Sequence, residues 1–228
     1  MAGGLLLFVA TPAMLFCWLV NRRMWIYPLA HWGADLWLRS SGATVRISGL
    51  ENIDPNRSYV FASNHRSYLD TATLFFHAGT KMGLVAKKEL LKVPVLGQGM
   101  GFVNIVAIDR SNPERALASM KQAADVMRSG FSFGVFVEGT RAAPGELLPF
   151  KKGAFHLALQ TGAPIVPVAI RNTDWMMGKG SGLAFPGVIE MVLLPAIETK
   201  DVDPNTAVTD LLTQTRSAIA AELAREAE

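Results

Sequence analysis

The sequence predicts an α/β fold: a mixed, partly parallel sheet flanked by helices, with an N-terminal membrane-associated helical segment before it. From Ala43 onward, stretches rich in β-branched and aromatic residues alternate with stretches of helical periodicity. Such alternation is typical of α/β sandwiches with a largely buried sheet. The 228 residues, half of them hydrophobic, suit one large core better than two full domains. We therefore expect membrane-anchoring helices over residues 1–40 and one α/β domain over residues 41–228.

The N-terminal run, residues 3–20, carries no charge and is followed at once by Arg22 and Arg23. Its length is at the lower limit for spanning a hydrocarbon core of about 30 Å. A signal peptide would carry its charges before the apolar run and a cleavage site of small residues after it, so the order here argues against one. Because basic residues favour the cytoplasmic side, we expect Arg22, Arg23 and the rest of the chain on the cytoplasmic face of the inner membrane.

Residues 24–38 are aromatic and apolar with few charges, which is typical of a helix lying in the lipid interface. Together with the apolar run, this segment predicts a membrane anchor that contacts membrane lipids. The pattern allows two arrangements, in which the first helix crosses the bilayer or the pair of helices dips into one leaflet.

The later elements follow from local patterns. A short apolar helix is expected at 69–76, a longer one at 111–129 with a Ser111–Glu114 capping box and a stop at Gly130, and an amphipathic C-terminal helix at 208–223. The stretches that favour strands are 44–48, 59–62, 82–86, 104–108, 131–137, 165–170 and 188–194. Active sites of such sheets lie in the loops at strand ends.

The composition excludes several classes of site. Cys17 is the single cysteine and the four histidines are scattered, so neither a disulfide framework nor a metal site is expected. A formal charge of +3, with no basic stretch interleaved with aromatic residues, argues against a nucleic-acid partner. Some of the basic residues gather in clusters that indicate an anion-attracting surface. The clustered residues are Arg22, Arg23, Lys81, Lys87, Lys88, Lys92, Arg141, Lys151 and Lys152.

The turn after the second expected strand reads Asn64-His65-Arg66-Ser67-Tyr68-Leu69-Asp70. On a continuous helix a spacing of five would separate His65 and Asp70 by about 140°, so their pairing requires the turn between them. A neutral imidazole so paired can accept a proton from a hydroxyl through its other nitrogen, while the aspartate fixes the tautomer. The alternative is structural, in which His65 caps the helix and Asp70 is favoured by the helix dipole.

A second polar turn, Glu138-Gly139-Thr140-Arg141, follows the apolar strand that ends at Val137. A small residue lets the backbone approach a ligand, a hydroxyl and N–H groups can bind oxygens, and an arginine fork suits a phosphate. The alternative is a surface turn with a Glu–Arg ion pair. Two further segments also belong to strands: Ile108-Asp109-Arg110, which places a cation at a strand end, and Pro164-Ile165-Val166-Pro167, which enters a strand.

In order and spacing, these four segments resemble the four motifs of the glycerolipid acyltransferase family, whose bacterial members acylate 1-acyl-glycerol-3-phosphate. The resemblance covers residues 58–170 and extends to the apolar N-terminus and to Lys87-Lys88-Glu89-Leu90. One position departs from the family pattern, because Val137 stands where a proline is usual. Valine is expected to continue the strand by one residue, which bears on substrate preference more than on activity.

The resemblance implies direct acyl transfer without a cofactor or a covalent acyl-enzyme. His65, oriented by Asp70, would be the general base on the sn-2 hydroxyl of 1-acyl-glycerol-3-phosphate, with acyl-CoA or acyl carrier protein as donor, giving phosphatidic acid for phospholipid biosynthesis. Arg141 would bind the phosphate. The other residues expected to bind substrate are Arg110, Glu138, Gly139, Thr140 and, as a weaker prediction, Lys87.

Two other hypotheses remain open at this stage. The chain could be a related acyltransferase that uses another acceptor, such as a lysophospholipid with a different head group or a lyso-ornithine lipid. It could also be a non-catalytic lipid-binding protein of the membrane surface, for which His65 would be dispensable. A hydrolase is disfavoured because the sequence has no Gly-x-Ser-x-Gly nucleophile elbow.

Overall fold

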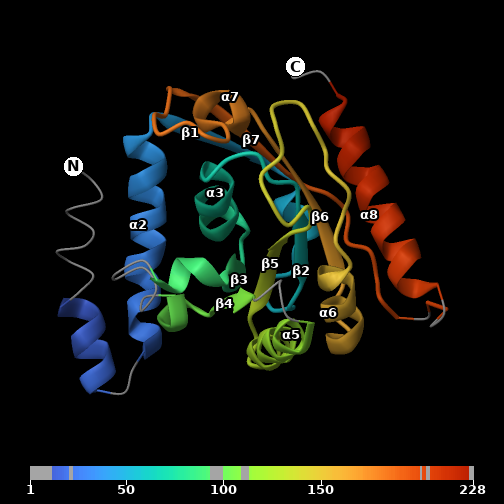
Figure 1. Cartoon of the computed structure of the whole chain (residues 1–228), viewed down its shortest axis with the longest axis horizontal. Coiled ribbons are helices and arrows are strands. Elements are labelled where there is room, and N and C mark those ends of the chain that lie inside the picture. The colour runs from blue at the N-terminus through green and yellow to red at the C-terminus, as the bar shows by residue number, and fades with distance from the viewer. Residues whose placement is uncertain are drawn as a thin grey trace.

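The computed structural model describes residues 12–20, 23–92, 100–108, 113–200, 202–203 and 206–225. Their strands form one seven-stranded sheet in the order β1-β7-β6-β2-β5-β3-β4 (Figure 1). The strands are β1 (Ala43–Ser48), β2 (Val60–Ser63), β3 (Met82–Lys87), β4 (Ile105–Ile108), β5 (Ser132–Phe136), β6 (Ile165–Arg171) and β7 (Gly187–Leu193).

The sheet is mixed. Strands β6, β2, β5, β3 and β4 run parallel to one another, whereas β7 is antiparallel to β6 and pairs in parallel with β1. The carboxyl ends of β2, β3, β4, β5 and β6 therefore lie at one edge, called here the catalytic edge. The amino end of β7 lies at the same edge because its direction is reversed.

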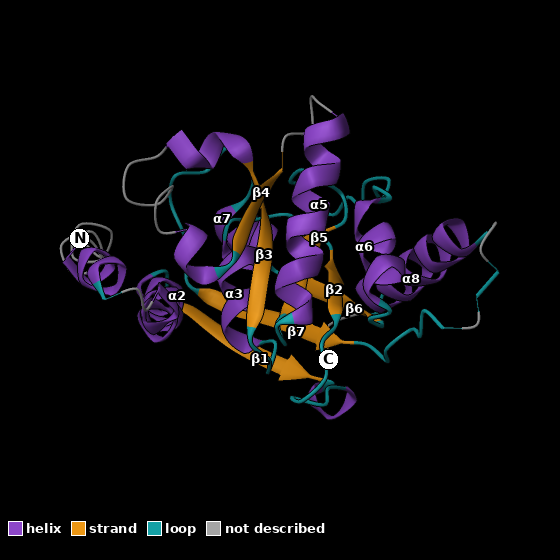
Figure 2. Cartoon of the chain, turned by 90° about the horizontal axis from the view of Figure 1, so that it is seen from below, coloured by secondary structure: helices purple, strands orange, loops and turns teal. Residues whose placement is uncertain are grey.

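Helices cover both faces of the sheet, as Figures 1 and 2 show. On β2 the side chains alternate between the two sides, because Phe61 belongs to one hydrophobic cluster and its neighbours Val60 and Ala62 belong to the other. The first cluster includes residues of α2 and α3, and the second includes residues of α5, α6 and α8. The helices are α2 (Tyr27–Ser40), α3 (Leu69–His77), α5 (Pro113–Arg128), α6 (Gly153–Thr161), α7 (Thr173–Met177) and α8 (Ala207–Leu223), with 3-10 turns at η1 (Arg23–Ile26), η2 (Leu50–Asn52), η3 (Lys88–Lys92) and η4 (Gly101–Val103).

The N-terminal helices share the core of the domain. In the helix over 12–19, Met14 and Cys17 are buried in the first cluster, and in α2 the hydroxyl of Tyr27 accepts a hydrogen bond from the Met82 N–H at 2.8 Å. The opposite side of the 12–19 helix is apolar and exposed, with Leu15, Phe16, Trp18 and Leu19 each more than half exposed. None of the helices among the described residues combines the length and apolar character needed to cross a membrane.

The predicted α/β class is confirmed, and the seven predicted strands are present with ends shifted by at most two residues. The predicted helices at 69–76, 111–129 and 208–223 correspond to α3, α5 and α8. Helices α6 and α7 had not been assigned from the sequence. Ser111, the expected cap of α5, lies outside the described residues, and the division into 1–40 and 41–228 stays a prediction.

Candidate active site

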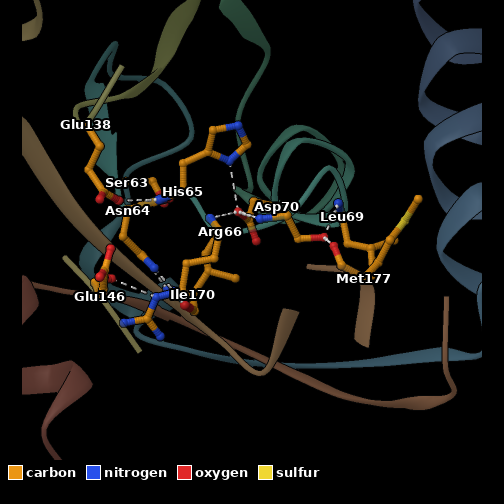
Figure 3. Close-up of polar contacts among 11 residues, drawn as sticks. Ser63, Asn64, His65, Arg66, Leu69, Asp70, Glu138, Glu146, Ile170 and Met177 are labelled. Atoms are coloured by element: carbon orange, nitrogen blue, oxygen red, sulfur yellow. Dashed lines mark hydrogen bonds and ion pairs between the residues drawn. The ribbon is translucent and has the colours of Figure 1, made fainter. Parts of the chain in front are cut away.

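The turn between β2 and α3 is fixed to the sheet by Asn64, which is fully buried. Its amide oxygen accepts the Ile170 N–H at 2.8 Å and its amide nitrogen donates to the Ile170 carbonyl at 2.9 Å. These two bonds continue the pairing of β2 with β6 beyond the last residue of β2. The next residue, His65, therefore leaves the sheet at a defined point on the catalytic edge (Figure 3).

His65 and Asp70 are brought together as the spacing predicted. The His65 Nδ1 lies 2.9 Å from Asp70 Oδ2, and the side chain of Asp70 is fully buried while that of His65 is 14% exposed. The same Asp70 oxygen accepts the backbone N–H groups of Arg66 at 2.6 Å and Ser67 at 2.8 Å. Because an ionised carboxylate can only accept, Nδ1 carries the proton and the other ring nitrogen, which points away from Asp70 in Figure 3, is left as an acceptor.

The imidazole is also supported by Phe136, the last residue of β5. The two rings are stacked, with centroids 4.0 Å apart and an interplanar angle of 19°. Phe136 is opposite Ser63 in the parallel register of β5 and β2, and its ring stacks on His65, two residues beyond the end of β2. Ring stacking and the bond to Asp70 together restrict the imidazole from two sides.

Glu138 bridges two loops through backbone groups. Its Oε1 accepts the His65 N–H at 2.7 Å and its Oε2 accepts the Leu148 N–H at 2.6 Å. The residue is 2% exposed. Burial raises the pKa of the Glu138 carboxyl, and the N–H groups of Leu148 and His65 oppose that rise. Both oxygens of this predicted substrate-binding residue thus hold the position of His65 and of the 142–150 loop.

Arg141 lies at the same turn, close to the catalytic pair. Its guanidinium carbon is 3.8 Å from the centroid of the Tyr68 ring, and its buried Nη1 has no hydrogen-bond partner in the described part of the chain. The Ala142 N–H donates to the His65 carbonyl at 2.8 Å, so the residue after Arg141 is bonded directly to His65. This arrangement places a cation with an unpaired donor at the turn that contacts His65.

Gly139 and Thr140 complete the turn. Gly139 has a φ of 76°, a left-handed conformation that favours glycine, and its N–H donates to the Phe136 carbonyl at 3.0 Å. Thr140 is exposed. Together they reverse the chain after β5, which lets Glu138 point inward and Arg141 reach Tyr68.

The two remaining predicted residues are further from this cluster in the sequence. Lys87 ends β3 at the catalytic edge, is 63% exposed and forms an ion pair with Glu89 at 3.5 Å. Arg110 lies outside the described residues. Within the described ranges, no cluster of three or more His, Cys, Asp or Glu side chains could hold a metal ion.

The structure adds Tyr68, Arg66 and Asp174 to the residues around the site. Arg66 is 9% exposed, its Nε donates to the Glu146 carbonyl at 3.1 Å, and its Nη1 lies 3.4 Å from Asp174 Oδ2. That Asp174 oxygen also accepts the Gly145 N–H at 3.1 Å. Arg66 and Tyr68 stand inside the histidine motif, so their neighbourhood could be inferred from the sequence, but nothing in the sequence marks Asp174 as their partner.

The comparisons with known proteins agree with this geometry. The family model described as Acyltransferase matches residues 44–171. The chain is 40% identical over 170 residues to a 1-acyl-sn-glycerol-3-phosphate acyltransferase of Limnanthes alba, which covers 74% of this chain and 59% of that protein. It is 32% identical over 207 residues to the protein of that name from Pseudomonas aeruginosa, covering 88% and 77%. The chain thus spans less than two thirds of the length of the plant relative.

Among solved structures, the crystal structure of the 1-acyl-sn-glycerophosphate (LPA) acyltransferase PlsC from Thermotoga maritima has the same fold. The TM-score is 0.77 at 24% sequence identity, and the match covers 99% of this chain and 90% of that one. The family model spans more than half of the chain and includes both motif turns. We conclude that the chain belongs to the acyltransferase family, which confirms the resemblance predicted from its four motifs.

Proposed function

We propose that this protein transfers a fatty acyl group from acyl-CoA or acyl carrier protein to the sn-2 hydroxyl of 1-acyl-sn-glycerol-3-phosphate, giving phosphatidic acid. The observation that carries the proposal is the His65–Asp70 pair, 2.9 Å apart, with the open guanidinium donor of Arg141 at the adjoining turn. The printed names of the relatives from Limnanthes alba and Pseudomonas aeruginosa support this acceptor.

In the proposed reaction, His65 Nε2 takes the proton of the sn-2 hydroxyl while that oxygen attacks the thioester carbonyl carbon. Asp70 stabilises the imidazolium that forms, because its buried carboxylate accepts a hydrogen bond from Nδ1–H. The tetrahedral intermediate then collapses, the carbon–sulfur bond breaks, and the imidazolium returns the proton to the leaving thiolate. The acyl thioester is a co-substrate, and the proposal includes no cofactor or metal.

The tetrahedral intermediate carries an oxyanion that needs hydrogen-bond donors. In the catalytic turn, the N–H of His65 already donates to Glu138, and those of Arg66 and Ser67 donate to Asp70. These three groups are therefore committed to positioning the general base. The donors for the oxyanion in this mechanism are groups other than these three.

The exposed apolar side of the 12–19 helix supports a membrane location for the reaction. Leu15, Phe16, Trp18 and Leu19 present an uncharged apolar surface. Trp25 in η1 and Trp32 in α2 add further exposed aromatic side chains. We infer that this surface rests in the lipid interface on the cytoplasmic face of the inner membrane. The lipid acceptor then reaches the catalytic edge without leaving the membrane.

A donor-by-acceptor activity matrix in detergent micelles tests the proposal. The wild-type protein should acylate 1-acyl-glycerol-3-phosphate much faster than lysolipids with other head groups. His65→Ala should abolish transfer, and Asp70→Asn should lower kcat by about a hundredfold to ten-thousandfold with little change in KM.

Two results would contradict the proposal. If lysophospholipids or lyso-ornithine lipid were the faster acceptors, the protein would be a related acyltransferase of different specificity. If His65→Ala kept full activity, or the wild type transferred acyl groups from no donor, the non-catalytic lipid-binding hypothesis would replace the enzymatic one.

A further inference from the structure

We propose that Tyr68 is a positioning residue that holds the guanidinium of Arg141 for the acceptor phosphate, and so sets the preference for a phosphate-bearing acceptor. This inference rests on the proposed function and adds a determinant of its specificity. Tyr68 occupies one of the positions between His65 and Asp70 and was not expected to bind substrate.

The contact between the two side chains is close. The guanidinium carbon lies 3.8 Å from the centroid of the Tyr68 ring, well within the distance of about 6 Å at which a cation over an aromatic face is attracted to it. The ring is 46% exposed, so Tyr68 is not a core residue whose aromatic character is explained by packing. Its aromatic character is instead explained by the cation that it supports.

Both partners are anchored within two residues of the contact. On one side, the Ser67 N–H donates to Asp70 and the Ser67 hydroxyl donates to the Met177 carbonyl at 2.7 Å. On the other side, the Ala142 N–H donates to the His65 carbonyl. The ring and the guanidinium are therefore held by the same backbone segments that hold the general base.

The guanidinium is left with an open donor. Nη1 of Arg141 is buried and without a hydrogen-bond partner among the described residues, whereas the largely buried Arg66 and Arg171 form ion pairs with Asp174 and with Glu190 and Glu222. A buried N–H group without an acceptor is unfavourable, and a phosphate oxygen would satisfy it. Stacking fixes the plane of the fork in advance, which lowers the cost of ordering it when the phosphate binds.

The test compares Tyr68→Leu with Tyr68→Phe, which keeps the aromatic face, on two acceptors: 1-acyl-glycerol-3-phosphate and 1-acyl-glycerol, which lacks the phosphate. Tyr68→Leu should raise KM for the phosphate-bearing acceptor by about threefold to thirtyfold and leave kcat and the donor KM within about twofold. Tyr68→Phe should stay within about twofold of the wild type throughout. In an Arg141→Met background, Tyr68→Leu should have no further effect on that KM.

A binding measurement that needs no turnover separates this inference from the proposed function. Glycerol 3-phosphate should bind to Tyr68→Leu more weakly than to the wild type by a similar factor, and to Tyr68→Phe with the wild-type affinity. If these binding differences appear while no acyl transfer occurs, the proposed function fails and the role of Tyr68 stands. The inference is overturned if Tyr68→Leu binds as the wild type does, if Tyr68→Phe loses as much as Tyr68→Leu, or if kcat falls equally on both acceptors with KM unchanged.

Discussion

At the scale of single residues, Glu138 is the side chain whose structural position differs most from what its motif suggests. Its two oxygens accept the N–H groups of His65 and Leu148, and it is 2% exposed. A carboxylate buried in this way is poorly accessible to a substrate hydroxyl. We infer that its contribution to the reaction is to hold the catalytic turn against the loop after β5.

Glu138→Gln should therefore change kcat more than KM. Glutamine offers one acceptor oxygen where the carboxylate offers two, so either His65 or Leu148 would face an NH₂ group with its N–H unpaired. We expect kcat to fall by about tenfold to a hundredfold, with KM for the acceptor within about twofold. Steady-state kinetics measures both, and Glu146→Gln, an exposed carboxylate in the same loop, is the matched control. A raised KM at unchanged kcat would instead place Glu138 on the substrate.

The sequence was sufficient to pair His65 with Asp70, because a turn that follows a strand can close a spacing of five where a helix cannot. It was not sufficient to decide what Glu138 contacts. A carboxylate before a glycine can accept hydrogen bonds either from a ligand or from backbone N–H groups. Tyr68 was missed for a related reason. Its partner Arg141 lies in a different motif, and contacts between distant residues, such as the bond between Ala142 and His65, bring the two together.

At the scale of elements, α8 is joined to the sheet by a largely buried ion pair. Arg171, the last residue of β6, lies 2.7 Å from Glu222 and 3.3 Å from Glu190, and their side chains are 13%, 7% and 18% exposed. Arg57 and Glu198 form a second pair at 2.6 Å, but that pair is 40% and 51% exposed. The Arg171–Glu222 and Arg57–Glu198 pairs therefore lie in different surroundings, one largely buried and one exposed.

Glu222→Gln should lower the free energy of unfolding by about 2 kcal/mol, because it removes the shorter of two ion pairs of Arg171 where water is scarce and leaves the pair with Glu190. Glu198→Gln, the matched exposed variant, should cost less than about 1 kcal/mol. Urea denaturation followed by circular dichroism measures both. Equal losses in the two variants would mean that burial does not control the strength of the α8 ion pair.

Two histidines at the contact between α2 and α3 are expected to make the free energy of unfolding depend on pH. His31 packs against Phe76 and Phe75 with ring centroids 4.8 and 5.3 Å apart, and burial lowers the pKa of both His31 and His77 below the ordinary value of 6.5. Asp35 opposes the lowering at His77. Below pH 6.5 the unfolded chain takes up protons at these positions more readily than the folded chain does.

The free energy of unfolding should therefore fall as the pH drops below 6.5, and His31→Phe should reduce the size of that fall. Denaturation curves at about pH 7.5 and about pH 5.5 measure the difference. An undiminished pH dependence in His31→Phe would show that protonation of His31 contributes nothing to it.

Most strands were predictable because they are compact apolar runs with β-branched residues. Val137 was expected to extend the fifth strand by one residue, but β5 ends at Phe136 and only the Val137 N–H continues the pairing. That N–H donates to the Ser63 carbonyl at 3.0 Å, one step beyond the last paired residues of β2 and β5. Proline has no N–H and could not form this bond. Helices α6 and α7 were not predicted, because α6 begins at a glycine and α7 has only five residues.

At the scale of the whole molecule, the exposed apolar surface predicts binding to lipid. Wild-type protein should sediment with vesicles that contain anionic phospholipid. The double variant Leu15→Ser with Trp18→Ser should bind these vesicles at least about tenfold more weakly, since both side chains are more than half exposed. Leu50→Ser, which changes an exposed leucine of η2, is the control and should bind as the wild type does. Equal binding by all three proteins would show that the 12–19 helix does not contribute to membrane binding.

The topology was only partly predictable from the chain. Alternating strands and helices indicated parallel neighbours, but local patterns do not reveal that β7 runs against β6, because antiparallel and parallel strands share the same residue preferences. Strand order also depends on contacts between distant residues. The pairing of β2 with β6, for example, joins Val60 to Ile165.

The reversal between β6 and β7 gives this fold a freedom that a fully parallel sheet lacks. A parallel crossover would have to carry the chain back along the sheet, whereas here residues 172–186 leave and re-enter the sheet at the catalytic edge. That segment touches the catalytic turn through Asp174 and Met177 and then displays Leu183 and Phe185. Because both ends of this connection lie at the same edge, its length and composition between Met177 and Gly187 can change without altering the register of β6 and β7.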